Sequence, residues 1–275
     1  MVKVSPFILR SIWLRILVVL ALSIVIWWFI AYLNGLLIGE EYSRASHFII
    51  AVMTTILTMF LLQTTLKIDK IQWKHLGHRT FKKNISSFSL GFSLWLIPAA
   101  MGTIICLVLG WSEIILNTTI NNLLFSILIL FITVFLIEAL PEEFIFRGYI
   151  YRYLNGVFPH WVTILLQSLM FSLFAFSIGA MYSVEQLQFT PGFAIILGVF
   201  RSISGTMWIS IGFHVGMMTA TQILGPVHGH FEVNGMMTLQ FFAFILLPSI
   251  VGATVLSFIY HNHNWGKIEP LELHK

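Results

Sequence analysis

The stretch "LLFSILILFITVFLI", residues 123–137, contains no charged side chain, yet "EALPEEFIFRG", residues 138–148, follows it directly with three glutamates and one arginine. A long apolar run is typical of a helix that crosses a lipid bilayer. A charge at the bilayer centre costs roughly 2.5–3.5 kcal/mol on insertion scales, and less near an interface. The charged side chains at the end of this run therefore indicate a polar cavity or buried ion pairs inside a membrane protein.

The composition of the whole chain agrees with this interpretation. Of its 275 residues, 58% are hydrophobic and 9% are charged, and the mean hydropathy is +0.90. A soluble domain is about 45–50% apolar and about 25% charged. We therefore expect an all-α, polytopic membrane helix bundle in the lipid bilayer, forming a single membrane domain over residues 1–275. The pI near 9.3 does not indicate nucleic-acid binding, because the basic residues lie in loops between apolar runs.

Apolar windows joined by short polar connections predict about eight transmembrane helices. The first window is longer than the apolar part of a signal peptide and lacks a small-x-small cleavage site, so we expect it to be retained as the first span. The single cysteine, Cys106, excludes an internal disulfide and a cysteine-based zinc site. The windows are residues 11–38, 46–66, 87–110, 121–146, 161–182, 189–203, 205–224 and 236–260.

The distribution of basic residues predicts the orientation of the chain. With the N-terminus in the cytoplasm, all of the 15 Lys and Arg residues except Arg44 fall on the cytoplasmic side of these windows. Cytoplasmic loops of membrane proteins carry an excess of Lys and Arg. We therefore expect a multi-pass protein of the cell membrane with both termini in the cytoplasm.

The spacing of the charged side chains predicts separate roles for the two adjacent glutamates. On a helix, Glu143 and Arg147 are one turn apart and can form an ion pair. Glu142 lies about 100° around the helix from Glu143 and shares a helix face with Glu138. Arg147 can therefore hold Glu143, which leaves Glu142 to face a cavity as a general base or metal ligand. The simpler alternative is a helix end with an ordinary salt bridge.

A histidine in a later span is the second candidate. In "SGTMWISIGFHVGMMTATQ", residues 204–222, His214 lies between Gly212 and Gly216. This small-xxx-small pattern lets a neighbouring helix approach closely on either side of the imidazole. The simpler alternative is a histidine that serves only packing.

The two stretches carry a pair of motifs, Glu-Glu-x-x-x-Arg and Gly-x-x-Trp-x-x-Ile-x-x-His. Together they resemble the CPBP family of intramembrane endopeptidases, which includes CAAX prenyl proteases of the Ras-converting type and bacterial Abi proteins linked to bacteriocin immunity. The resemblance covers about residues 120–225. The matching positions are Glu142, Glu143 and Arg147 in the first motif and Gly205, Trp208, Ile211 and His214 in the last.

The resemblance implies a helical bundle with a cavity that opens toward the cytoplasmic side. There Glu142 would activate water, and His214 would bind a metal or stabilise the oxyanion. Glu143 and Arg147 would be the supporting pair. The implied substrate is a membrane-associated peptide or protein, and the implied metal is a divalent ion such as zinc, held by Glu142 and His214.

Two positions depart from the family pattern. Ala175 stands where the middle motif, Phe-x-x-x-His, has its histidine, with Phe171 in place, and Met218 stands where an asparagine normally follows His214. One carboxylate and one imidazole leave a zinc ion short of the usual three protein ligands. A methionine cannot donate a hydrogen bond to an oxyanion.

Three functions therefore stay open. The first is a working intramembrane endopeptidase with Glu142 as the base. The second is a catalytically inactive relative that binds a membrane peptide or partner, which the residues at 175 and 218 favour. The third is a transporter or lipid-binding protein that uses the charged cavity, although the sequence shows no internal repeat of the kind common in transporters.

Two further groups of histidines are weaker candidates. His228, His230 and Glu232 alternate in the loop "GPVHGHFEVNG", and an extended strand would point all three to one side, where they could bind a divalent metal. An ordinary polar loop is the simpler interpretation. His261 and His263 in "HNHNWGK" are expected to belong to an interfacial tail.

Overall fold

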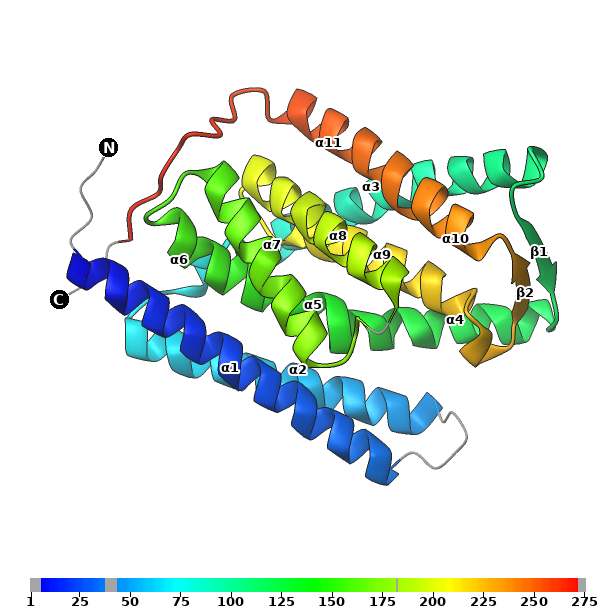
Figure 1. Cartoon of the computed structure of the whole chain (residues 1–275), viewed down its shortest axis with the longest axis horizontal. Helices are drawn as coiled ribbons and strands as arrows, with labels where there is room; N and C mark the ends of the chain where they lie inside the picture. The colour runs from blue at the N-terminus through cyan, green and yellow to red at the C-terminus, as the bar shows by residue number, and fades with distance from the viewer. Residues whose placement is uncertain (1–5, 38–43, 182, 272–275) are drawn as a thin grey trace.

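The computed structural model describes residues 6–37, 44–181 and 183–271, and most of them are helical (Figure 1). This confirms the predicted all-α bundle. The α-helices are α1 (Pro6–Leu37), α2 (Arg44–Asp69), α3 (Phe81–Val108), α4 (Ile120–Val134), α5 (Leu140–Glu143), α6 (Tyr151–Asn155), α7 (His160–Ser177), α8 (Val184–Ser204), α9 (Trp208–Ile223), α10 (Met236–Thr238) and α11 (Leu247–Ile259). The remaining elements are η1 (Trp73–Leu76), η2 (Phe135–Ala139), η3 (Phe144–Ile150), η4 (Pro226–His228), η5 (Leu239–Leu246), β1 (Glu113–Leu116) and β2 (Phe231–Asn234).

Within the described residues, seven helical segments are long and apolar enough to cross a membrane, which supports a multi-pass membrane protein. The seventh predicted span, residues 205–224, is shorter than expected. It forms α9, which has 16 residues, whereas a full span needs about 20. Gly205, with a φ of 69°, ends α8 in the left-handed conformation that favours glycine and so separates the two helices.

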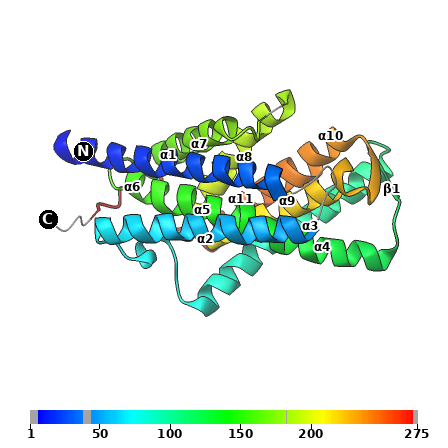
Figure 2. The same ribbon diagram turned by 90° about the horizontal axis from the view of Figure 1, so that it is seen from below.

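Helix α9 lies inside the bundle and contacts α3, α4 and α8. Figures 1 and 2 show α1 and α2 side by side along one edge of the molecule, while α3 and α11 lie along the opposite edge. Most residues of α9 are buried. A short, mainly apolar helix suits this interior position, because it needs no face toward water.

Close contact between α3 and α9 depends on glycine. A Cβ at Gly91 would lie 2.0 Å from the carbonyl oxygen of Ile209, and a Cβ at Gly212 would lie 2.1 Å from that of Phe88. At Gly216 a Cβ would lie 2.6 Å from the ring of Trp95. The predicted close approach on either side of His214 is therefore correct, and α3 is the helix that makes it.

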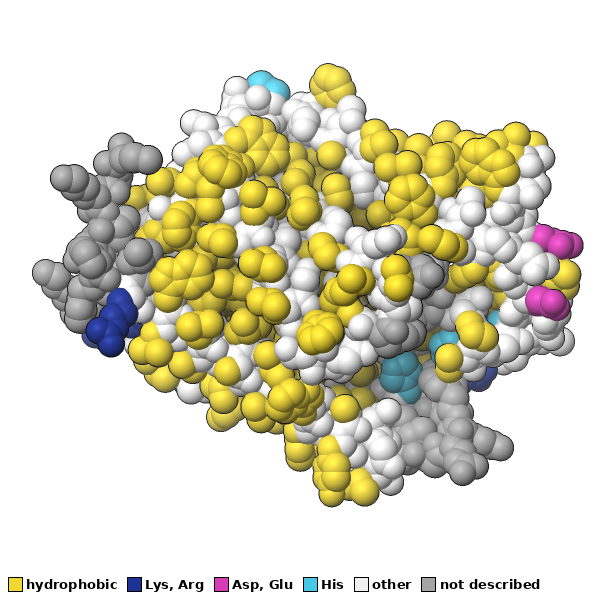
Figure 3. Space-filling view, viewed as in Figure 1, with side chains coloured by type: hydrophobic (Ala, Val, Ile, Leu, Met, Phe, Trp, Pro, Cys, Tyr) yellow, Lys and Arg dark blue, Asp and Glu magenta, His cyan; other side chains and the backbone are white. Residues whose placement is uncertain are grey.

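The surface has the distribution of side chains that a lipid environment requires. Figure 3 shows hydrophobic side chains over most of one face, with Lys, Arg, Asp and Glu only near its two ends. Many large apolar side chains are exposed along the helices, among them Leu14, Phe60, Ile97 and Phe176. In a soluble protein an exposed apolar surface of this extent would drive association.

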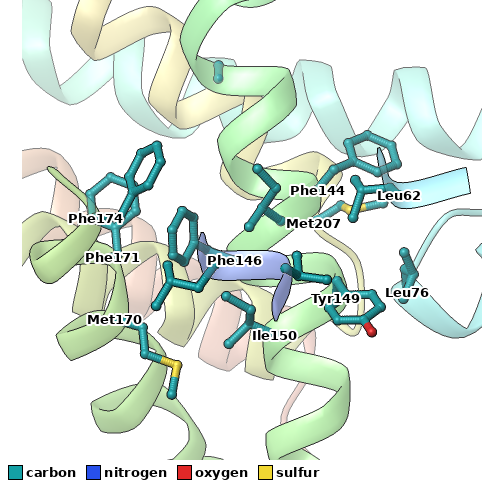
Figure 4. Packing of buried hydrophobic residues seen from close by; sticks show 14 of the residues in the cluster. Leu62, Leu76, Phe144, Phe146, Tyr149, Ile150, Met170, Phe171, Phe174 and Met207 are labelled. Carbon is teal, nitrogen blue, oxygen red and sulfur yellow. The ribbon is translucent and has the colours of Figure 1, made fainter. Parts of the chain in front are cut away.

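A cluster of buried hydrophobic side chains, aromatic and aliphatic, forms the core around the segment that follows the glutamates (Figure 4). The ring centroid of Phe146 lies 5.0 Å from that of Phe171 and 5.2 Å from that of Phe174. Both contacts are between η3 and α7. They fix the rotation of the helix that carries the charged residues.

A buried carboxylate joins three helical segments at one end of the bundle. Asp69, the last residue of α2, forms an ion pair with Arg15 of α1 and accepts a hydrogen bond from the hydroxyl of Tyr149 at 2.8 Å. The hydroxyl of Tyr153 donates to the same carboxylate. These contacts tie α1 and α2 to η3 and α6.

The sequence did not indicate the small sheet at the other end of the molecule. Strands β1 and β2 pair antiparallel, with Glu113 opposite Asn234 and Leu116 opposite Phe231. The extended conformation predicted for the loop around His228 holds only for residues 231–234. His228 itself ends the 3-10 turn η4, and Gly229 follows with a φ of 63°. The loop therefore does not point His228, His230 and Glu232 to one side along a single strand.

Candidate active site

The helix that carries the glutamates is not a regular α-helix. It runs from Ile120 to Asn155, and two π-helical segments, η2 and η3, flank the short α5 that contains Glu142 and Glu143. The sequence predicted an ordinary helix here. Pro141 explains part of the difference, because proline has no N–H to donate and its ring crowds the carbonyl of the preceding turn. Segments of π-helix occur frequently at functional sites.

Glu143 and Arg147 form the predicted ion pair, with Nη1 of Arg147 3.0 Å from Oε1 of Glu143. Both side chains are fully buried. Arg147 also donates from Nη2 to the carbonyl oxygen of Ala194 at 3.2 Å, and its guanidinium lies over the ring of Phe171 at 4.7 Å from the centroid. The pair thus joins η3 to α7 and α8.

His214 contacts both glutamates. Its Nδ1 lies 3.0 Å from Oε1 of Glu143, the oxygen that also accepts from Arg147. Its Nε2 lies 4.0 Å from Oε2 of Glu142. An ionised Glu143 accepts a hydrogen bond from the Nδ1–H of His214, which sets the orientation of the ring and turns Nε2 toward Glu142. The sequence predicted that His214 lies near Glu142, but it did not predict the hydrogen bond between His214 and Glu143.

Glu142 and His214 line a cavity of about 350 Å³. Glu138 also lines it and accepts a hydrogen bond from Nε2 of Gln222 at 2.8 Å. The predicted shared face of Glu138 and Glu142 is therefore correct. The other lining residues are mainly apolar: Trp27, Ile137, Phe171, Ala175, Ile178, Ala180, Phe189, Phe193, Met217, Met218 and Ile245, with Gln186, Thr190, Thr221 and Gln240.

Ala175 and Met218, the two departures from the family pattern, both line this cavity. The methyl group of Ala175 and the thioether of Met218 therefore line the same cavity as Glu142 and His214. Phe193 from α8 packs edge-on against His214, with ring centroids 5.0 Å apart. The surroundings of the Glu142 and His214 pair are therefore less polar than the family pattern implies.

The opening of the cavity toward the cytoplasmic side stays a prediction. The lining extends from Glu142 to the connection between α7 and α8, where Ile178, Ala180 and Gln186 lie. The span prediction places this connection away from the cytoplasm. Among the described residues, no side chain of the basic loop 67–83 and neither Arg147 nor Arg152 lines the cavity.

The donor set does not fit a zinc ion held by Glu142 and His214. In the described part of the chain, no three His, Cys, Asp or Glu side chains are grouped in a way that could hold a metal ion. A catalytic zinc site has three protein ligands.

No sequence pattern predicted three polar side chains that line the cavity, Gln186, Thr190 and Gln240. Gln222, which donates to Glu138 of the lining, was not predicted either. A signal for them exists, because each amide interrupts a mainly apolar stretch and a polar group inside a bilayer needs a partner. The hydrogen bond between Gln222 and Glu138 becomes visible only in the tertiary structure, because 84 residues separate the two in the sequence.

Comparison with known proteins agrees with the geometry. Residues 122–220 match the family model described as Type II CAAX prenyl endopeptidase Rce1-like. The matched segment contains Glu142, Glu143, Arg147 and His214. A search of curated proteins found no match. The segment that carries the candidate site, residues 122–220, is therefore similar to the CAAX-type prenyl endopeptidases that this model describes.

Proposed function

We propose that this protein is an intramembrane endopeptidase that hydrolyses peptide bonds of membrane-associated peptides or proteins, with Glu142 as the general base. One observation carries this proposal. In the wall of a largely apolar cavity, Nε2 of His214 lies 4.0 Å from Oε2 of Glu142. The other ring nitrogen of His214, Nδ1, contacts Glu143. A base and a positioned imidazole beside an apolar chamber are the parts that hydrolysis of an apolar peptide needs.

In the proposed reaction, the carboxylate of Glu142 takes a proton from a water molecule as the water oxygen bonds to the peptide carbonyl carbon. His214 in its protonated form presents Nε2–H to the cavity and stabilises the negative carbonyl oxygen. The C–N bond then breaks, and the proton held by Glu142 passes to the leaving amine. Glu143 stays ionised between Arg147 and His214 and positions both, without touching the substrate.

The same arrangement supports a second candidate, a non-catalytic relative that binds a membrane peptide. Ala175 and Met218 make two positions of the cavity apolar where the family has polar groups. Such a cavity keeps the shape that binds an apolar segment and loses groups that assist hydrolysis. Under this alternative, Glu142 would hold a polar group of the peptide instead of activating water.

Hydrolysis in water enriched in oxygen-18 separates the two candidates. The purified full-length chain is incubated in lipid nanodiscs with a set of apolar membrane peptides, and the products are weighed by mass spectrometry. For an endopeptidase we expect two fragments, one of which carries a single heavy oxygen in its new carboxyl group. Photocrosslinking of an intact peptide to α7 or α9, without any fragment, would instead support the binding protein.

We further propose the cell membrane as the location, with both termini in the cytoplasm. The excess of basic residues in the loops assigned to that side supports this orientation. Two of these residues, Lys3 and Lys275, lie outside the described part of the chain. Protease protection of epitope tags at either terminus in sealed vesicles tests the orientation.

A further inference from the structure

Glu138 is a carboxylate of the Glu142 cavity to which the proposed reaction assigns no role. It belongs to η2, one helical turn before Glu142, and both side chains line the same cavity. Nε2 of Gln222 donates to its Oε1 at 2.8 Å. Among the described residues, no donor contacts its other oxygen, Oε2, which is buried. Within that part of the chain, Glu138 therefore receives one hydrogen bond, and the donor is uncharged.

Glu142 is also poorly compensated. It lines the cavity, although only 8% of its surface is exposed. In the described structure its ion-pair contact, with Nε2 of His214, is 4.0 Å long. A buried carboxylate is costly unless hydrogen-bond donors or an opposite charge compensate it. Two carboxyl groups of this cavity therefore lack the partners that buried charges need.

The charges around the cavity do not balance within the described residues. Three carboxylates, those of Glu138, Glu142 and Glu143, lie in or beside it with two cations, Arg147 and the protonated His214 of the proposed reaction. Arg147 and Nδ1 of His214 both contact the same oxygen of Glu143. No lysine or arginine lines the cavity in this part of the chain. One carboxylate of the lining is thus left without an opposite charge.

The rest of the lining suits a cation that has an apolar body. The rings of Trp27, Phe171, Phe189 and Phe193 line the cavity. An aromatic face attracts both apolar groups and cations. The side chains of lysine and arginine combine an apolar stem with a charged end. Such a side chain can pack against these rings while its charged end reaches a carboxylate.

We propose that the cavity recognises a membrane peptide that carries one lysine or arginine within an apolar segment, and that Glu138 binds the cationic group. Gln222 holds the carboxylate of Glu138 in place for this contact. A hydrogen bond between a cation and a carboxylate is stronger than one between neutral groups. This inference rests on the proposed function and adds the substrate class: Glu138 selects the peptide on which Glu142 acts.

The spacing of the two glutamates predicts where the basic residue lies in the peptide. Four residues of helix rise about 6 Å. An extended peptide advances about 3.3 Å for each residue. We therefore expect the basic residue about two residues from the bond that Glu142 attacks.

Binding of matched peptides to the full-length protein in lipid nanodiscs tests the proposal. Two fluorescent peptides share one apolar sequence and differ only at a central position, which is lysine in one and its uncharged analogue norleucine in the other. Their dissociation constants are measured before fragments accumulate, with empty nanodiscs as the blank. Comparing protein variants on the same two peptides cancels the difference in how the peptides partition into lipid.

Three variants separate the charge of Glu138 from its other contributions. Glu138→Gln removes the charge and keeps an oxygen that can accept from Gln222, whereas Glu138→Asp keeps the charge. Glu232→Gln makes the same change as the first variant at an exposed position of β2 and is the matched control. Thermal unfolding of each variant shows whether the fold is kept.

Wild type and Glu232→Gln should favour the lysine peptide over the norleucine peptide, and Glu138→Gln should lose roughly ten-fold of this preference, about the size of one charge-assisted hydrogen bond. Glu138→Asp should keep most of it. Wild type should also bind the lysine peptide more tightly than a peptide with glutamate at that position, a comparison that needs no variant. Equal preferences in wild type and Glu138→Gln, or tighter binding of the glutamate peptide by wild type, would overturn the proposal.

The binding measurement also separates this inference from the proposed function. The dissociation constants are defined even if no fragment forms. A protein that prefers the lysine peptide and cleaves neither peptide supports the cation site and contradicts the endopeptidase. Cleavage of both peptides with equal affinities supports the endopeptidase and overturns the cation site.

Discussion

Glu143 and His214, 71 residues apart in the sequence, meet at 3.0 Å between Oε1 and Nδ1, and the same oxygen accepts a hydrogen bond from Arg147. One fully buried carboxylate thus neutralises an arginine and orients a histidine. Among the described residues, the polar contact of Glu142 is a long one, 4.0 Å to the other ring nitrogen. The division of roles between two adjacent glutamates follows from this arrangement.

Removing Glu143 should destabilise the protein strongly. Glu143→Leu leaves the guanidinium of Arg147 buried without its counter-charge, and a broken buried ion pair costs about 3–5 kcal/mol. The double variant Glu143→Leu with Arg147→Met removes both charges and should lose less than the single variant. The free energy of unfolding in mixed micelles measures both. A double variant that is less stable than Glu143→Leu would contradict the ion-pair assignment.

Gly212→Ala should disrupt the contact between α9 and α3. The added Cβ would lie 2.1 Å from the carbonyl oxygen of Phe88, so the two helices must separate. Overpacking of this kind costs about 1–3 kcal/mol. Gly192→Ala is the matched control, because a Cβ on this exposed residue of α8 meets no atom within 4 Å. Thermal unfolding should show a lower midpoint for Gly212→Ala, and equal midpoints would argue against close packing.

Asp69→Ala should loosen the attachment of α1 and α2 to the rest of the bundle. The change leaves the hydroxyls of Tyr149 and Tyr153 without their acceptor, at about 1–3 kcal/mol for each buried group. Tyr149→Phe with Tyr153→Phe removes the donors instead and should cost less. Limited proteolysis of the α1–α2 hairpin reports the loosening. If Asp69→Ala resists proteolysis as wild type does, the carboxylate does not tie these helices together.

Polar groups restored at the two divergent positions should raise hydrolysis. Ala175→His with Met218→Asn returns an imidazole and an amide to the cavity that Glu142 and His214 line. The amide can donate a hydrogen bond to the oxyanion, an interaction worth roughly 10²–10³ in rate in other acyl-transfer enzymes. Initial rates on one membrane peptide measure the gain. An unchanged rate, with wild-type stability, would mean that these positions do not face the reacting bond.

Local sequence patterns predicted much of this fold. Apolar windows located the spanning helices, and the spacing of Glu143 and Arg147 predicted their ion pair because one turn of helix fixes it. The glycines around His214 predicted a close helix contact. They could not identify α3 as the neighbour, because that choice depends on the tertiary fold.

Other features depended on contacts that no local pattern encodes. The bond from His214 to Glu143, the pairing of Gln222 with Glu138 and the β1–β2 sheet all join segments far apart in the sequence. The π-helical turns around Pro141 arise from backbone geometry that a hydrophobic pattern does not report. The direction in which the cavity opens was inferred from a resemblance alone and stays a prediction.

The role of Glu142 as general base is tested by the turnover of the variant Glu142→Gln. Glu232→Gln, the same change at an exposed position of β2, is the control. Both variants should unfold near the wild-type temperature, since the polar contact that Glu142 makes in the described part of the chain is the long one with His214. We predict that Glu142→Gln lowers the rate of membrane-peptide hydrolysis by roughly 10²–10⁴-fold, as expected for loss of a general base, while Glu232→Gln keeps the wild-type rate. Hydrolysis by Glu142→Gln at the wild-type rate would contradict the claim.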